Sequence, residues 1–107
     1  MSKFANVVTI DVMPGRRDQV VALLLTHKSR LNDEPGTLQF EVLLAKHEDT
    51  TIRVHEMYRD AAAFEVHLNG PFLAQWKKET AGMVVRLHGV RCAVVEESIH
   101  QSTPANH

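Results

Sequence analysis

The sequence predicts one α+β domain with a four-stranded antiparallel sheet and helices on one face of it. Two observations lead to this fold class. The chain has 107 residues, of which 44% are hydrophobic and 23% charged, which is the ordinary balance of one globular domain. Its expected elements follow the order strand, helix, strand, strand, helix pair, strand, which is the split βαβ arrangement of ferredoxin-like folds.

The first two elements are a strand over residues 4–13 and a helix over residues 16–32. The strand segment is rich in β-branched residues and ends at a Pro-Gly turn signal. In the helix segment, apolar residues recur at three- and four-residue spacing, as they do on the buried face of a helix. His27 and Lys28 border this apolar stripe, and we expect both side chains to be solvated.

Two more strands, over residues 38–45 and 52–59, are joined by a short polar loop. The short connection makes the two strands antiparallel. Side chains alternate between the two faces of a strand, so Glu56 and Tyr58 share a face with the apolar Val54.

Two short helices and a fourth strand complete the expected domain. Asp60 is a good N-cap for a helix that runs through Leu68, and a proline suits the first turn of the helix that follows. That second helix carries four apolar residues on or near one face: Phe72, Leu73, Trp76 and Met83. The fourth strand is expected over residues 89–97. We therefore expect a domain over residues 1–97 and a C-terminal tail or arm over residues 98–107.

Apolar residues on both faces of the expected strands predict a dimer. Helices would cover one face of the sheet, and the bare face would expose a large apolar surface. A second copy of the chain covers that surface most economically. We therefore expect a two-fold homodimer joined through the sheets, a dimeric α/β-barrel assembly. The alternative is a monomer whose C-terminal tail covers the same face.

Composition and charge exclude several classes of protein. No stretch approaches the ~20 apolar residues that a membrane span needs. The net charge is −1, whereas a nucleic-acid-binding domain is usually strongly basic, so nucleic-acid binding is not expected. The single cysteine, Cys92, cannot form an intrachain disulfide, and the first residues lack the basic-then-apolar pattern of a signal peptide. We therefore expect a cytoplasmic protein.

The seven histidines are the main compositional hint of chemistry, but no pair has convincing metal-ligand spacing. His55 and Glu56 are adjacent on a strand and so face opposite sides of the sheet. No glycine-rich phosphate loop and no Gly-x-Ser-x-Gly turn occurs. Cys92 falls within an expected strand, where an inert core thiol is the ordinary interpretation. We therefore expect neither a metal nor another cofactor.

Six residues remain as candidates for a functional site, three polar and three aromatic: Glu56, Tyr58, His67, Phe64, Phe72 and Trp76. A carboxylate on an apolar strand face must be paired, hydrogen-bonded or protonated. Glu56 is therefore either half of a salt bridge to an arginine at the dimer interface or the polar group of a pocket. His67 is either a hydrogen-bonded residue at a helix end or a general base, because imidazole titrates near neutral pH.

The three aromatic candidates also have two interpretations. Phe64, Phe72 and Trp76 either fill the hydrophobic core or form the walls of a cavity for a flat ligand. A buried Trp76 needs a hydrogen-bond partner for its indole N–H.

Four segments of the sequence resemble the antibiotic biosynthesis monooxygenase (ABM) domain family. They are residues 34–43 (Glu-Pro-Gly-Thr-Leu-Gln-Phe-Glu-Val-Leu), 55–60 (His-Glu-Met-Tyr-Arg-Asp), 65–67 (Glu-Val-His) and 71–72 (Pro-Phe). Their order and spacing resemble the family over residues 4–97. The resemblance implies a ferredoxin-like dimer. The family includes cofactor-free monooxygenases that act on quinols and anthrones, haem-degrading enzymes, and isomerases of small signalling sugars.

The sequence departs from the family pattern at two places. Many members have a second histidine directly after the proline that opens the second helix of the pair, and here that residue is Phe72. Haem-degrading members use an asparagine, a tryptophan and a histidine. Here Val8, rather than Asn6, stands in the place of the asparagine, and His67 stands in the place of the tryptophan. The resemblance therefore disfavours haem degradation and leaves His67 as the only family histidine.

The resemblance implies a cofactor-independent monooxygenase, similar to quinol monooxygenases, that oxidises a small aromatic quinol or anthrone with dioxygen. In this hypothesis His67 accepts or steers a proton, Tyr58 hydrogen-bonds the oxygen-bearing group, and Glu56 orients a neighbouring polar group. The three aromatic candidates form the walls. The alternatives are an isomerase or epimerase acting on a small oxygenated metabolite, and a non-catalytic binder of small molecules.

Overall fold

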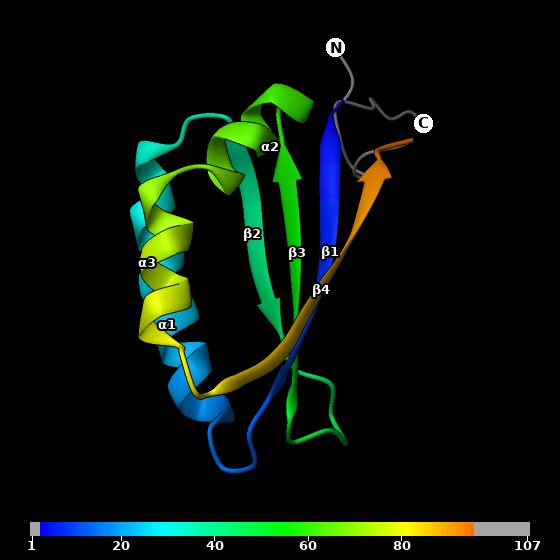
Figure 1. Ribbon diagram of the computed structural model, residues 1–107. Helices are drawn as coiled ribbons and strands as arrows, with labels where there is room; N and C mark the ends of the chain where they lie inside the picture. Colours follow the sequence, from blue (N-terminus) through cyan, green and yellow to red (C-terminus); the bar gives the residue numbers. More distant parts are fainter. Residues whose placement is uncertain (1–2, 96–107) are drawn as a thin grey trace.

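The computed structural model describes residues 3–95 and has the predicted α+β architecture (Figure 1). Its elements are β1 (Phe4–Val12), α1 (Arg17–Arg30), the short 3₁₀ helix η1 (Leu31–Asp33), β2 (Thr37–Leu43), β3 (Thr51–Tyr58), α2 (Ala61–Leu68), α3 (Pro71–Glu79) and β4 (Val84–Ala93). The strands form one antiparallel sheet in the order β2-β3-β1-β4, which confirms the ferredoxin-like prediction. The expected tail over residues 98–107 lies outside the described residues.

Local signals in the sequence set the ends of the helices. The Asp60 carboxylate accepts a hydrogen bond from the Ala63 backbone N–H at 2.9 Å, which caps α2 as predicted. A proline opens α3, where its missing N–H costs little. The guanidinium group of Arg30, in the last turn of α1, donates to the Glu79 carboxylate at 3.0 and 3.2 Å. This ion pair joins the end of α1 to the end of α3.

The fourth strand begins at Val84 rather than at Gly89. β4 pairs with β1 along its length, and Val84 lies opposite Val12. The prediction was wrong because β4 is an edge strand with mostly exposed side chains, so its first half lacks an apolar alternation. Met83, which was expected on the preceding helix, lies beyond the end of α3. Gly82, at φ 84°, turns the chain there.

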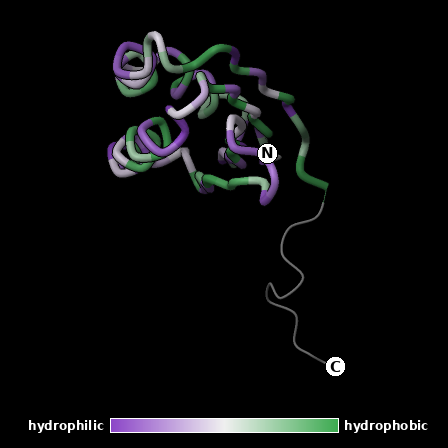
Figure 2. The backbone as a smooth tube through the Cα atoms, turned by 90° about the horizontal axis from the view of Figure 1, so that it is seen from below, coloured by the Kyte–Doolittle hydropathy of each residue, from purple (hydrophilic) through white to green (hydrophobic). Residues whose placement is uncertain are grey.

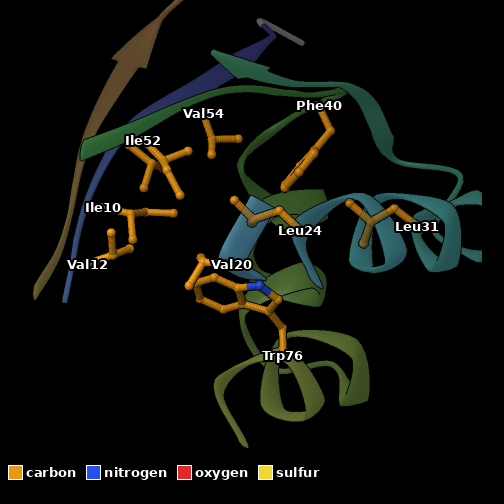
Figure 3. Close-up of a cluster of buried hydrophobic side chains, with 10 residues drawn as sticks. Ile10, Val12, Val20, Leu24, Leu31, Phe40, Ile52, Val54 and Trp76 are labelled. Atoms are coloured by element: carbon orange, nitrogen blue, oxygen red, sulfur yellow. The ribbon is translucent and has the colours of Figure 1, made fainter. Parts of the chain in front are cut away.

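The hydrophobic core lies between the sheet and the helices α1 and α3 (Figure 3). Alternate residues of β1 and β3 point toward the helices, and burial of each such side chain contributes about 1.5–3 kcal/mol. The fully or largely buried members drawn in Figure 3 include Ile10, Val12, Val20, Leu24, Leu31, Phe40, Ile52, Val54 and Trp76. A second cluster of Tyr58, Ala63 and Phe64 joins α2 to the sheet.

The other face of the sheet carries no helix of the described chain, as the view from below shows (Figure 2). Val7 of β1 and its partner Val90 of β4 lie on this open face and are 38% and 50% exposed. His55 of β3, the neighbour of Val7 on the strand opposite β4, shares this face. The open face therefore carries both apolar and polar side chains. Within residues 3–95, no helix combines the length and the hydrophobicity that crossing a membrane requires.

Candidate functional site

A cavity of about 110 Å³ lies between the sheet and the helices. Apolar core residues form most of its wall, and four buried polar side chains interrupt them: Asn6 of β1, His27 of α1, Glu56 of β3 and His67 of α2. Lys77 of α3 and Leu87 of β4 also line the cavity and are exposed, so its opening lies between α3 and β4. An apolar cavity with a few convergent polar groups is the usual form of a small-molecule site.

His67 and Glu34 form a buried pair at this cavity. The His67 Nδ1 atom lies 3.0 Å from Glu34 Oε1, and both side chains are buried. With the proton of this contact on Nδ1, His67 donates to Glu34, and the lone pair of its Nε2 atom is available to a ligand. Thr37 Oγ1 also donates to Glu34 Oε1 at 3.0 Å, which fixes the carboxylate.

The Glu-Pro-Gly turn explains how Glu34 reaches α2. The Thr37 backbone N–H donates to the Glu34 carbonyl oxygen at 2.9 Å and closes the turn. Gly36 then packs directly against α2, because a Cβ at this position would lie 2.5 Å from the Ala63 Cβ atom. Glu34 was quoted in the family motif but was not predicted as a site residue. Its signal was a carboxylate beside a tight turn, which is too common to single out a site.

Glu56 is the polar group of the sheet wall. Its Oε1 atom accepts hydrogen bonds from Tyr58 Oη at 2.7 Å and from Asn6 Nδ2 at 3.2 Å. Burial raises the pKa of Glu56 above its ordinary value, and the two hydrogen bonds oppose that rise. In the described part of the chain, hydrogen bonds rather than an arginine therefore satisfy this carboxylate.

Tyr58 is not among the residues that line the cavity, but its side chain packs against two residues that are. Its side chain is fully buried, and its ring packs 5.1 Å from the Phe64 ring and 5.5 Å from the His67 ring, between centroids. Burial and the neighbouring Glu56 raise the pKa of the Tyr58 hydroxyl. The structure thus connects Tyr58 to the site through its hydrogen bond to Glu56.

The three aromatic candidates occupy different places. Phe64 and Trp76 line the cavity, whereas Phe72 packs, partly buried, against the core in the first turn of α3. Figure 3 shows the Trp76 indole reaching from α3 toward the sheet. The Phe64 ring packs 4.9 Å from the Phe4 ring, and the Arg91 guanidinium lies 5.1 Å from its centroid. Phe64 is therefore a firmly held wall residue.

His27 is a cavity residue, and the expectation that it is solvated is wrong. Its side chain is 2% exposed, and its ring centroid lies 5.6 Å from that of His67 and 6.2 Å from that of Trp76. Burial, followed by the proximity of His67, lowers the pKa of His27 to about 4, so the ring is neutral at physiological pH. The available signal was its spacing from Val20 and Leu24, which places all three on one helix face.

Three residues that line the cavity each have one fully buried polar atom without a hydrogen-bond partner within residues 3–95: Asn6 Oδ1, His27 Nδ1 and Trp76 Nε1. Leaving one such buried atom unpaired costs about 1–3 kcal/mol. Asn6 Oδ1 lies against the backbone of β4, because a Cβ at Gly89 would be 2.7 Å from it. These atoms have almost no accessible surface, so they are unpaired inside the wall rather than open to the cavity.

Two other expectations concern metal binding and Cys92. Over residues 3–95, no group of three His, Cys, Asp or Glu side chains is placed to hold a metal ion. Cys92 pairs with Ala5 of β1 on the open face of the sheet and is partly exposed, rather than a core thiol. Its position on an edge strand explains the difference.

The chain was compared with curated proteins and with solved structures. No curated protein matches the chain. Among solved structures, a protein assigned provisionally as an antibiotic biosynthesis monooxygenase from Nitrosomonas europaea is 16% identical, with a TM-score of 0.82 over 88% of this chain and 91% of that one. A Pseudomonas aeruginosa protein is 19% identical, with a TM-score of 0.81 over 90% and 97%. A Nitrosomonas europaea protein of unknown function is 23% identical, with a TM-score of 0.80 over 99% and 98%.

These identities are low, so the structural matches establish a shared fold. The family model for antibiotic biosynthesis monooxygenase matches residues 3–79, which is most of the chain. The match confirms the resemblance seen in the four sequence segments. The chain therefore belongs to the antibiotic biosynthesis monooxygenase family.

Proposed function

We propose that the chain is a cofactor-independent monooxygenase that oxidises a small, single-ring quinol with dioxygen. The observation that carries this proposal is the Glu34–His67 pair, which presents an imidazole base to a mostly apolar cavity. Family membership supports the reaction class. The alternatives share the fold. An isomerase would also use a base, but it would need hydroxyl-binding polar groups along the cavity, whose wall here is mostly apolar, and a non-catalytic binder would need no base.

The reaction balances with dioxygen as the only oxidant. A 1,4-quinol and dioxygen give a hydroxyquinone and water, so one oxygen atom enters the ring and the other leaves as water. The electrons come from the quinol itself, and deprotonation of a phenolic hydroxyl makes the ring a better electron donor. In this proposal His67 Nε2 takes that proton, and Glu34 stabilises the imidazolium that forms. A positioned base contributes about 10²–10⁴-fold to the rate.

The volume of the cavity narrows the class of substrate. An apolar cavity of about 150 Å³ holds one benzene molecule. At about 110 Å³, this cavity suits a single ring that reaches partly into the opening between α3 and β4. A three-ring anthrone does not fit unless those elements separate. The size therefore favours the quinol over the anthrone among the expected substrates.

The remaining predicted residues support the substrate in this proposal. Phe64 and Trp76 form the aromatic walls, and Phe72 packs against the core in the first turn of α3. Glu56 orients the Asn6 amide, while the Tyr58 hydroxyl holds Glu56 in place. We also propose that two copies of the chain join through the open face of the sheet, where Val7 and Val90 are exposed.

The His67→Ala variant tests the proposed function. Oxygen uptake is measured with an electrode over a panel of single-ring quinols, corrected for their spontaneous oxidation, and the product is examined for one atom of ¹⁸O from labelled dioxygen. We expect turnover to fall by about 10²–10⁴-fold. The control is His47→Ala, which removes an exposed histidine in the loop between β2 and β3, away from the cavity. Unchanged turnover in His67→Ala, or quinol binding without oxygen uptake by the unaltered protein, would contradict the proposal.

A further inference from the structure

Two basic side chains lie at the opening of the cavity or beside it. Lys77 of α3 lines the cavity, and its side chain is exposed. Arg91 of β4 is exposed, pairs with the cavity residue Asn6, and places its guanidinium group 5.1 Å from the centroid of the Phe64 ring, which also lines the cavity. Within residues 3–95, neither cation forms a salt bridge with an acidic side chain. The opening is therefore positively charged, with no anion of the described chain paired to it.

The interior of the cavity has the opposite character. Glu56 lines the sheet wall, and Glu34 pairs with the cavity residue His67. A further carboxylate placed deep in the cavity would meet these acidic groups in a mostly apolar surrounding, where an unpaired charge is costly. At the opening, an anionic group stays in contact with water and can meet the ammonium group of Lys77, which a long and flexible stem carries. The charges therefore favour a ligand with a neutral ring inside and an anionic substituent outside.

The size of the cavity agrees with this orientation. Its volume of about 110 Å³ is smaller than the about 150 Å³ of an apolar cavity that holds one benzene molecule. A single ring that fills it therefore has one edge at the opening, between α3 and β4. A substituent on that edge lies on the side of Lys77, whereas the opposite edge of the ring stays inside the cavity.

We propose that Lys77 binds an anionic substituent of the ligand, so that the cavity selects a single-ring aromatic carboxylate over its neutral counterpart. Arg91 adds to the attraction through the positive potential that it contributes near the opening. That the ring is a quinol rests on the proposed function, and the substrate class is then a dihydroxybenzoate. Its carboxylate lies outside at Lys77, and its ring carries a phenolic hydroxyl to His67. An exposed ion pair of this kind changes a binding constant by up to about 5-fold.

The test compares benzoate with benzamide, a neutral molecule of nearly the same shape. Binding is measured without dioxygen by NMR, through the indole N–H signal of Trp76, which lines the cavity and is the only tryptophan. We expect benzoate to bind about 5-fold more tightly at low salt, and this preference to fall below about 2-fold in Lys77→Gln. The control is Lys78→Gln, where the preference should remain. Lys78 is also exposed and makes no salt bridge in the described chain, but it does not line this cavity.

Salt provides a second measurement on the unaltered protein. Raising sodium chloride from about 0.01 M to about 1 M shortens the Debye length from about 30 Å to about 3 Å. The preference for benzoate should then nearly vanish, while benzamide binding changes little. A preference that is absent from the unaltered protein, that survives in Lys77→Gln or in 1 M salt, or that Lys78→Gln removes equally would overturn the inference.

These measurements need no turnover, so the inference and the proposed function can fail separately. A protein that prefers benzoate but consumes no dioxygen with any quinol would refute the proposed function alone. A protein that oxidises neutral quinols but binds benzoate no more tightly than benzamide would refute the role of Lys77 alone.

Discussion

Replacing Tyr58 with phenylalanine tests the hydrogen bond that holds Glu56 at the cavity. The change removes one hydroxyl group and keeps the ring packed against Phe64 and His67. In the native protein the hydroxyl donates to Glu56 Oε1 at 2.7 Å, and both side chains are buried. A hydrogen bond to a charged group contributes about 1.5–3 kcal/mol. We therefore expect Tyr58→Phe to lower the free energy of unfolding by about that amount when Glu56 is ionised.

The size of this loss should depend on pH. Burial raises the pKa of Glu56, and the hydrogen bond from Tyr58 lowers it. Removing the Tyr58 hydroxyl should therefore raise this pKa further. A carboxyl group with a higher pKa in the folded than in the unfolded state makes the free energy of unfolding fall as pH rises through the folded pKa. That fall is larger in the variant. The loss should therefore grow from pH 5 to pH 8, because a protonated carboxyl would lose only a neutral bond worth about 0.5–1.5 kcal/mol.

Urea unfolding followed by Trp76 fluorescence measures the free energy at both pH values. Ile52→Val serves as the control, because Ile52 is fully buried in the apolar core. It should lose about 0.5–1.5 kcal/mol at either pH. A Tyr58→Phe loss that is the same at pH 5 and pH 8 would show that the hydroxyl does not stabilise an ionised Glu56.

Two further predictions concern the turn before β2 and the open face of the sheet. Gly36→Ala places a methyl group 2.5 Å from the Ala63 Cβ atom and so displaces Glu34 from His67. Quinol turnover should fall by up to about 10²-fold, as it does when a catalytic group is misplaced by about 1 Å. It should partly recover in the double variant Gly36→Ala/Ala63→Gly. Steady-state kinetics that show no fall in Gly36→Ala would mean that the turn tolerates a methyl group. Val90→Glu adds a charge where two sheets would meet, so sedimentation velocity should detect a monomer, whereas Val66→Glu on the exposed side of α2 should leave a dimer. A native protein that sediments as a monomer would remove the proposed interface.

Most of the fold could be predicted because its signals are local. Asp60 caps α2 through its own side chain, and a proline begins α3, so both helix starts follow from a few adjacent residues. The start of β4 could not be predicted in this way. Val84 belongs to the sheet because it pairs with Val12, which is far away in the sequence, and its exposed neighbours show no alternation.

The site was harder to predict than the fold, because burial decides which polar residues meet. Glu56, Phe64, His67 and Trp76 could be chosen from their strand face and helix positions, and all four line the cavity. His27 was missed, because a histidine at the border of an apolar stripe is buried only if another element covers it. Trp76 and the backbone of Phe72 provide that cover, and both belong to α3.

Gly89 connects the edge of the sheet with the cavity. Its missing side chain allows the Asn6 amide to lie directly on the β4 backbone, and that amide in turn donates to Glu56. Position 89 is therefore subject to two constraints. It lies on the edge strand β4, and it also packs against the buried side-chain amide of Asn6. An alanine there would alter the inner wall while leaving the outer surface nearly the same. A buried contact thus limits which residues position 89 can hold, although the position lies on an edge strand where exposure alone would suggest free substitution.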